Sequence, residues 1–170
     1  MEILVYGTIN SVMLALYALG FAMVYGVSRL PNFAHGALYV LSGFITWSFL
    51  NSLGLNYLLS IVLAILATGI IGALIYQFVL IRVRGMEISE IMASYAIGLA
   101  ILEGLRYGGF KGMTYTLPAF ISGSTEIAGV PVDYQRVLVV VIGIAVVALL
   151  WLFTRYTRIG LALRGMAQDE

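Results

Sequence analysis

The chain has 170 residues, of which 62% are hydrophobic and only 10% are charged. Because soluble domains carry about 25% charged residues, this composition is typical of a membrane protein. The net charge of +1 gives no footprint for nucleic acid, and a sequence without cysteine excludes disulfides and thiolate chemistry.

The first half of the chain predicts three membrane-spanning helices, since a span needs about 20 mostly apolar residues. Residues 3–28 carry no charge and predict the first. They continue past the roughly 7–15 apolar residues of a signal peptide and follow no basic region, so we do not expect cleavage. Residues 33–50 predict a second span and residues 51–56 a short polar turn. Residues 55–81 predict a third span, long enough to tilt in the bilayer.

The second half predicts two further spans. Residues 88–107 form the weaker one because Glu103 and Arg106 lie near its end, three residues apart, where we expect them to pair. A loop-like stretch follows, and residues 137–153 predict the fifth span. The tail, residues 154–170, is expected in water or against a soluble partner. We therefore expect an all-α transmembrane bundle of about five spans, forming one integral-membrane domain over the whole chain.

The distribution of basic residues favours an external amino terminus. In that orientation six basic residues face the cytoplasm and three lie outside. The cytoplasmic set is Arg29, Arg82, Arg84, Arg155, Arg158 and Arg164, and the external set is Arg106, Lys111 and Arg136. A re-entrant segment at residues 29–36, in place of a loop, would turn the first helix over relative to the rest.

The segment between the first two spans, residues 29–36, is called the break. It reads Arg-Leu-Pro-Asn-Phe-Ala-His-Gly, and polar groups at membrane depth are costly, so such a cluster is a candidate functional site. We expect the side chain of Asn32 to cap a helix that begins at Phe33, with Pro31 favouring that start. His35 is the only histidine, and no cysteine or nearby acid completes a metal site. This favours a structural role for His35, with a place in the substrate pathway or a proton relay as the alternatives.

Several chemical functions are disfavoured. The acidic residues fall at span ends, in loops or in the tail, which weakens the case for a proton-coupled transporter. No Gly-x-Ser-x-Gly elbow and no Gly-x-x-x-x-Gly-Lys-Ser/Thr phosphate loop is present. We therefore expect no catalysis and no ATP hydrolysis by this chain. Charge alone leaves two interpretations of the tail: a basic anchor on lipid headgroups, or a surface for a cytoplasmic partner.

Two motifs resemble the permease subunits of branched-chain amino-acid ABC importers. One is Asn32-Phe33-Ala34-His35-Gly36, after a helix that ends Phe-Ala-Met-Val-Tyr-Gly at residues 21–26. The other is Thr-Arg-Ile-Gly-Leu-Ala-Leu-Arg at residues 157–164, which matches a Thr/Ser-Arg-x-Gly-x-Ala-x-Arg segment of that family. The resemblance implies that Asn32, Phe33, Ala34, His35 and Gly36 shape the permease core, and that Arg158, Gly160 and Arg164 approach the ATPase.

The resemblance also implies a mechanism and partners. Substrate would cross by alternating access between two permease subunits in the cell (inner) membrane. A soluble substrate-binding protein would deliver it to residues 107–136. Cytoplasmic ATPase subunits would bind the ATP, so no cofactor is expected in this chain.

Alternatives stay open at this point. Permeases of this family continue beyond the position of Glu170, so we expect a truncated or split permease. A urea or short-chain amide permease of the same superfamily is the nearest alternative. A small ion-coupled transporter or channel, and an inactive fragment, are the others.

Overall fold

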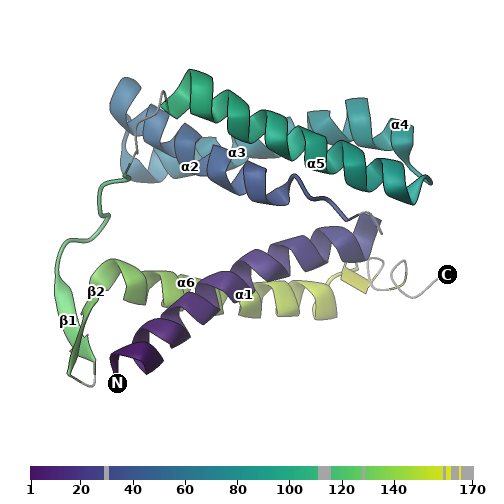
Figure 1. Ribbon diagram of the computed structural model, residues 1–170. Coiled ribbons are helices and arrows are strands. Elements are labelled where there is room, and N and C mark those ends of the chain that lie inside the picture. The colour runs from purple at the N-terminus through teal and green to yellow at the C-terminus, as the bar shows by residue number, and fades with distance from the viewer. Residues whose placement is uncertain (29–30, 111–115, 128, 159, 162–164, 166–170) are drawn as a thin grey trace. The chain divides into compact units, whose positions relative to one another are not determined.

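The structure, a computed structural model, describes residues 1–28, 31–110, 116–127, 129–158, 160–161 and 165 (Figure 1). Its elements are the helices α1 (Glu2–Ser28), α2 (His35–Ser52), α3 (Tyr57–Ile75), α4 (Ile81–Val83), α5 (Glu87–Gly104) and α6 (Tyr134–Tyr156), the π-helices η1 (Tyr76–Leu80) and η2 (Leu105–Phe110), and the strands β1 (Ser124–Ile127) and β2 (Val130–Asp133). Contacts divide the chain into two compact units, residues 1–29 with 119–170 and residues 30–118.

Four helical stretches in the described residues are long and apolar enough to cross a membrane: Glu2–Gly26, Tyr57–Val83, Ile88–Gly109 and Tyr134–Tyr156. They correspond to the first, third, fourth and fifth predicted spans. The second predicted span is also helical, as α2, but its 18 residues include His35, Asn51 and three serines and do not reach the same apolarity. Large apolar side chains such as Ile144 and Leu149 are exposed along these helices, as a surface in contact with lipid requires. The fold is an all-α polytopic bundle.

In the unit of residues 30–118, α2 packs against both α3 and α5 (Figure 1). A tight turn with Gly54 at a φ of +63° reverses the chain between α2 and α3. The N-cap residue of α3 is Asn56, whose side chain accepts a hydrogen bond from the Leu58 amide at 3.2 Å. A Cβ atom added at Gly109 would lie 2.9 Å from the ring of Phe44, so the end of α5 with η2 lies beside the middle of α2.

In the other unit, α1 runs alongside α6, and the β-hairpin packs against the amino-terminal part of α1. Ile9 of α1 and the strand residues Val130 and Val132 form a small buried core. The Tyr6 hydroxyl donates a hydrogen bond to the Pro131 carbonyl oxygen at 2.6 Å. Further along the two helices, a Cβ atom added at Gly143 of α6 would lie 2.8 Å from Leu16 Cδ1 of α1. The two helices therefore run in the same direction.

The hairpin corrects the prediction of a loop at these positions. β1 and β2 pair antiparallel, from Ser124 opposite Asp133 to Ile127 opposite Val130. Gly129, with a φ of +77°, lies in the turn. Strands of four residues are too short for their alternation to stand out in the sequence.

The expected pairing of Glu103 and Arg106 is confirmed. Their side chains form an ion pair at 3.6 Å, and both are largely exposed. An exposed pair of this kind contributes about 0–1 kcal/mol, so it stabilises the end of α5 only slightly.

Candidate functional site

Within the described part of the break, residues 31–36, two backbone amides bond to Asn32. Asn32 Oδ1 accepts a hydrogen bond from the Ala34 amide at 3.0 Å, and the His35 amide donates to the Asn32 carbonyl oxygen at 3.2 Å. α2 begins at His35, two residues later than predicted, with Ala34 at the N-cap position and no side chain capping that residue. The predicted helix start at Phe33 is wrong, and so is the predicted cap: Asn32 accepts the Ala34 amide in the turn that precedes α2, which has no side-chain cap.

A serine from α5 fastens the break from the side. Ser94 Oγ accepts a hydrogen bond from the Phe33 amide at 3.2 Å. The same oxygen lies 3.3 Å from the Pro31 carbonyl oxygen and 3.1 Å from that of Ile91, so its single proton is shared between two acceptors. Ser94 is only 1% exposed. The break is therefore held from α5 by a buried hydroxyl that serves both its donor and its acceptor groups.

One turn further along α5, at Gly98, the backbone of α5 comes into contact with the backbone of the break. A Cβ atom at Gly98 would lie 3.4 Å from Ala34 Cα and 3.5 Å from the Phe33 carbonyl oxygen. Ala34 itself is completely buried. Small residues permit this close approach, which in lipid replaces the hydrophobic effect as the force between helices. Ser94 and Gly98 together fix the start of α2 on one face of α5.

Glu90 continues the same face by one turn. It is 4% exposed, and its Oε1 accepts a hydrogen bond from the Gly85 amide at 2.6 Å. Gly85 has a φ of +90°, which turns this amide toward the carboxylate. A carboxylate in the first turn of a helix also interacts favourably with the positive end of the helix dipole. Glu90 thus closes the α4–α5 connection, and its burial was not predicted.

The remaining residues of the first motif lie at the start of α2 or just before it. His35 and Gly36 are half-buried at the start of α2, and Phe33 is 51% exposed. Among the described residues, no three histidine or acidic side chains gather in a way that could hold a metal ion. The structural role of His35 stays a prediction.

The second motif forms an elbow at the end of α6. Thr157 closes α6, with its amide 3.1 Å and its hydroxyl 2.6 Å from the Phe153 carbonyl oxygen. Thr157 Oγ1 then accepts a hydrogen bond from the Gly160 amide at 3.0 Å, and the Leu161 amide donates to the Thr157 carbonyl oxygen at 2.9 Å. One threonine therefore ends a helix and starts the next helical turn.

Gly160 makes this elbow possible. A Cβ atom there would overlap the Phe153 carbonyl oxygen and the backbone of Thr154, so only glycine fits. Arg158 is exposed beside it. Arg164, the third predicted residue on the ATPase side, lies outside the described residues. The resemblance singled out Gly160, and its contact with the end of α6 supplies a physical reason for a glycine at this position.

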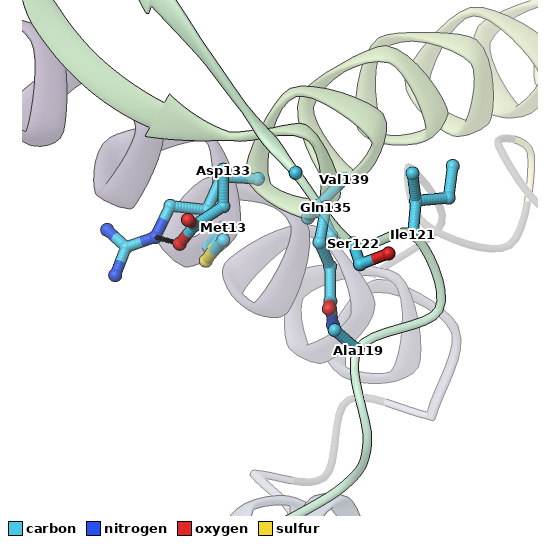
Figure 2. Close-up of a pocket in the computed structure, with 9 residues that line it drawn as sticks. Met13, Ala119, Ile121, Ser122, Asp133, Gln135 and Val139 are labelled. Carbon is cyan, nitrogen blue, oxygen red and sulfur yellow. Dashed lines mark ion pairs between the residues drawn. The ribbon is translucent and has the colours of Figure 1, made fainter.

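A pocket of about 510 Å³ lies at the amino-terminal end of α6, within the unit of α1, α6 and the hairpin (Figure 2). Met13, Ile121 and Val139 give it apolar walls, and Asp133 and Arg136 form an ion pair at 3.7 Å on its lining. The Arg136 guanidinium also lies 5.0 Å from the centre of the Tyr6 ring. Most of the residues that line the pocket belong to residues 107–136, the segment expected to contact a binding protein, and Met13 and Val139 lie outside that segment.

Comparison with known proteins identifies the family. The model of the family described as "Branched-chain amino acid transport system / permease component" matches residues 3–170. The chain belongs to this family. The resemblance inferred from the two motifs is thereby confirmed, and the chain is a multi-pass protein of the cell membrane.

Individual relatives agree with this assignment. The chain is 27% identical to the high-affinity branched-chain amino acid transport system permease protein BraD of Pseudomonas aeruginosa, covering 91% of this chain and 55% of the relative. It is also 27% identical to the permease proteins named LivH of Salmonella typhimurium and Escherichia coli K12, covering 91% of this chain and 54% of each. The chain thus spans about half the length of these relatives. No solved structure matches it.

Proposed function

We propose that this permease chain forms part of the translocation pathway of an ATP-driven importer for branched-chain or similar amino acids. The observation that carries the proposal is the family match over residues 3–170, which includes both motifs. The names of the relatives, all permeases of high-affinity branched-chain amino-acid transport, support the substrate class. Transport permeases, not enzymes, make up this set of relatives.

The geometry of the break supports a place for Asn32–Gly36 in the moving core. In its described part, Ser94 and Asn32 accept the amides of Phe33 and Ala34, which lowers the cost of placing these groups at membrane depth. Because Ser94 and the close approach at Gly98 fasten the start of α2 to α5, the two helices would move together. Alternating access is expected to occur by such rigid-body movements of helix groups.

The elbow supports a contact with cytoplasmic ATPase subunits. Thr157 and Gly160 redirect the chain where α6 ends, which is the cytoplasmic side in the orientation inferred from the basic residues. Arg158 is exposed there, and Arg164 follows in the same motif. In this proposal the partners bind and hydrolyse ATP and this chain carries no cofactor.

Two further partners complete the proposed transporter. A second permease subunit would line the pathway opposite this chain. A soluble substrate-binding protein would dock at residues 107–136, where the hairpin exposes Ile127 and the pocket carries the Asp133–Arg136 pair.

Leucine uptake separates this function from its alternatives. The complete reading frame that contains this chain is expressed, with and without its ATPase subunit, in cells lacking their own branched-chain amino-acid uptake. We expect uptake of labelled leucine only with the ATPase, and loss of uptake when ATP is depleted. Uptake that survives removal of the ATPase and stops with an ionophore would establish the ion-coupled alternative. Competition by urea or acetamide, with none by valine, would establish the amide permease.

A further inference from the structure

Three side chains gather at the carboxyl-terminal end of α6. The Arg155 guanidinium carbon lies 5.2 Å from the centre of the Trp151 ring and 6.0 Å from that of Tyr156. The two rings meet edge to face, with centres 6.2 Å apart and planes at 79°. Trp151 is 53% exposed and Tyr156 69% exposed. This group, the Trp151–Arg155–Tyr156 cluster, stands on the outside of its unit.

The cluster leaves hydrogen-bonding capacity on its cation. Within the described residues, the ion pairs are Glu103–Arg106 and Asp133–Arg136, so no described carboxylate neutralises Arg155. Stacking of a guanidinium on aromatic faces contributes about 0.5–1 kcal/mol at an exposed site and restrains its orientation. It does not use the in-plane N–H groups, whose fork matches the oxygens of a phosphate.

The position of the cluster along α6 indicates which phosphate it meets. The 23 residues of α6 extend about 34 Å, and the hydrocarbon core of a bilayer is about 30 Å thick, so the last turn reaches the headgroups. Tryptophan and tyrosine favour that depth because one side of each ring is apolar and the other carries a hydrogen-bond donor. Lipid phosphates lie there in a continuous layer.

We propose that the Trp151–Arg155–Tyr156 cluster binds the phosphate of an anionic membrane lipid and thereby fixes the depth of the end of α6. The rings lie against the upper acyl chain and glycerol, and the guanidinium donates two hydrogen bonds to the phosphate. Thr157 follows the cluster directly, so the bound lipid also fixes the height at which the elbow begins. This inference rests on the membrane location of the chain and does not depend on its substrate.

Fluorescence of Trp151 tests the proposal. Residues 1–170 contain two tryptophans, Trp47 and Trp151, so Trp47→Phe is combined with replacement of any tryptophan outside these residues to leave Trp151 as the only one. The complete permease carrying this change is placed in nanodiscs of phosphatidylcholine and phosphatidylglycerol. In one series the phosphatidylglycerol is brominated near the headgroup, and in the other the phosphatidylcholine is brominated at the same mole fraction.

We expect brominated phosphatidylglycerol to quench Trp151 with an apparent affinity about fivefold higher than brominated phosphatidylcholine, a difference worth roughly one charged contact at an anionic surface. Arg155→Gln abolishes the preference. Arg158→Gln, at a neighbouring exposed arginine that contacts no aromatic ring among the described residues, retains it. Circular dichroism confirms equal helicity of the variants.

Three results would overturn the inference. Equal quenching by both lipids in the parent protein means that no lipid is selected, and this result does not depend on how any variant folds. Equal loss of preference in Arg155→Gln and Arg158→Gln means that diffuse charge, not the cluster, attracts the lipid. Loss of the preference on adding inorganic phosphate at constant ionic strength means that the site takes a free anion.

Discussion

Two asparagines in the unit of residues 30–118 each accept a hydrogen bond from the backbone amide two residues further on, close to a helix start. Asn32 Oδ1 accepts from the amide of Ala34, and Asn56 Oδ1 accepts from that of Leu58. Asn56 is exposed in the short turn, whereas Asn32 is half-buried in the break beside Ser94. Asn56 caps α3, whereas Asn32 holds the turn before α2, so the pair separates a local stability effect from an effect at the candidate site.

We predict that Asn32→Ala and Asn56→Ala each lower the free energy of unfolding by about 1 kcal/mol, the usual cost of a lost side-chain hydrogen bond in a turn or at a helix cap. Only Asn32→Ala should also lower leucine uptake, because its helix start belongs to the proposed core. Thermal unfolding of the detergent-purified variants and initial uptake rates measure the two effects. An equal loss of uptake in Asn56→Ala would assign the effect to stability alone.

Ser94 carries a second prediction. Ser94→Ala leaves the Phe33 amide without its acceptor and should cost about 1–3 kcal/mol, the penalty for a buried unsatisfied donor. Ser42→Ala is the matched control, because that hydroxyl donates to the Tyr39 carbonyl oxygen of its own helix at 2.8 Å. The melting temperatures of the two variants should differ clearly. Equal shifts would show that the hydroxyl of Ser94 does not hold the break.

The contrast between Asn32 and Ser94 shows what sequence conveys at this scale. The hydrogen-bond partner of Asn32 lies only two residues away, and an asparagine after a proline favours such a local bond, so a contact with a nearby amide could be predicted. The contact of Ser94 with Phe33 spans 61 residues, and a single serine in an apolar helix gives no local signal. The burial of Glu90 has the same explanation, since it depends on a glycine amide turned toward it by the fold.

At the scale of elements, the long helices were predictable because runs of apolar residues follow from the thickness of the bilayer. Their ends were less so: α6 begins at Tyr134 and not at residue 137, and η2 extends the fourth span to Phe110. The hairpin was missed because its strands are short. The elbow appeared in the sequence only as a family motif, and its geometry required the contact between Gly160 and the end of α6.

The elbow gives a prediction of its own. Gly160→Ala places a methyl group against the backbone of Phe153 and Thr154, so the contact of residue 160 with the end of α6 must open. We expect severalfold less ATPase to purify with the permease, while the amount of folded protein in the membrane stays the same. Gly69→Ala in α3, where an added Cβ atom meets nothing within 4 Å, is the control and should retain the ATPase. Normal ATPase retention by Gly160→Ala would remove the elbow from the proposed interface.

At the scale of the whole molecule, chain direction agrees with alternating membrane crossings. α1 and α6 run parallel within their unit, α2 and α5 run parallel within theirs, and α3 returns beside α2 (Figure 1). Alternating crossings require the first and fifth spans, α1 and α6, to run in the same direction, and likewise the second and fourth spans, α2 and α5. The single-domain prediction for residues 1–170 and the external amino terminus stay predictions, because neither follows from contacts inside each unit.

Cysteine labelling tests the orientation directly, since the chain has no cysteine of its own. We predict that Ser52→Cys and Ser122→Cys react with a membrane-impermeant maleimide in intact cells. Met86→Cys, which is exposed between the third and fourth spans, should react only after the membrane is opened. The reverse pattern would invert the orientation and place the elbow on the external side, away from any ATPase.

The central claim is that this chain couples substrate movement to ATP hydrolysis in partner subunits. The most direct measurement is ATP hydrolysis by the purified complex in nanodiscs, with and without leucine-loaded binding protein. We predict hydrolysis that rises with loaded binding protein and loses this stimulation in the Gly160→Ala variant. Leucine transport by the same complex with no ATP hydrolysis, or stimulated hydrolysis that persists when this chain is left out, would contradict the account.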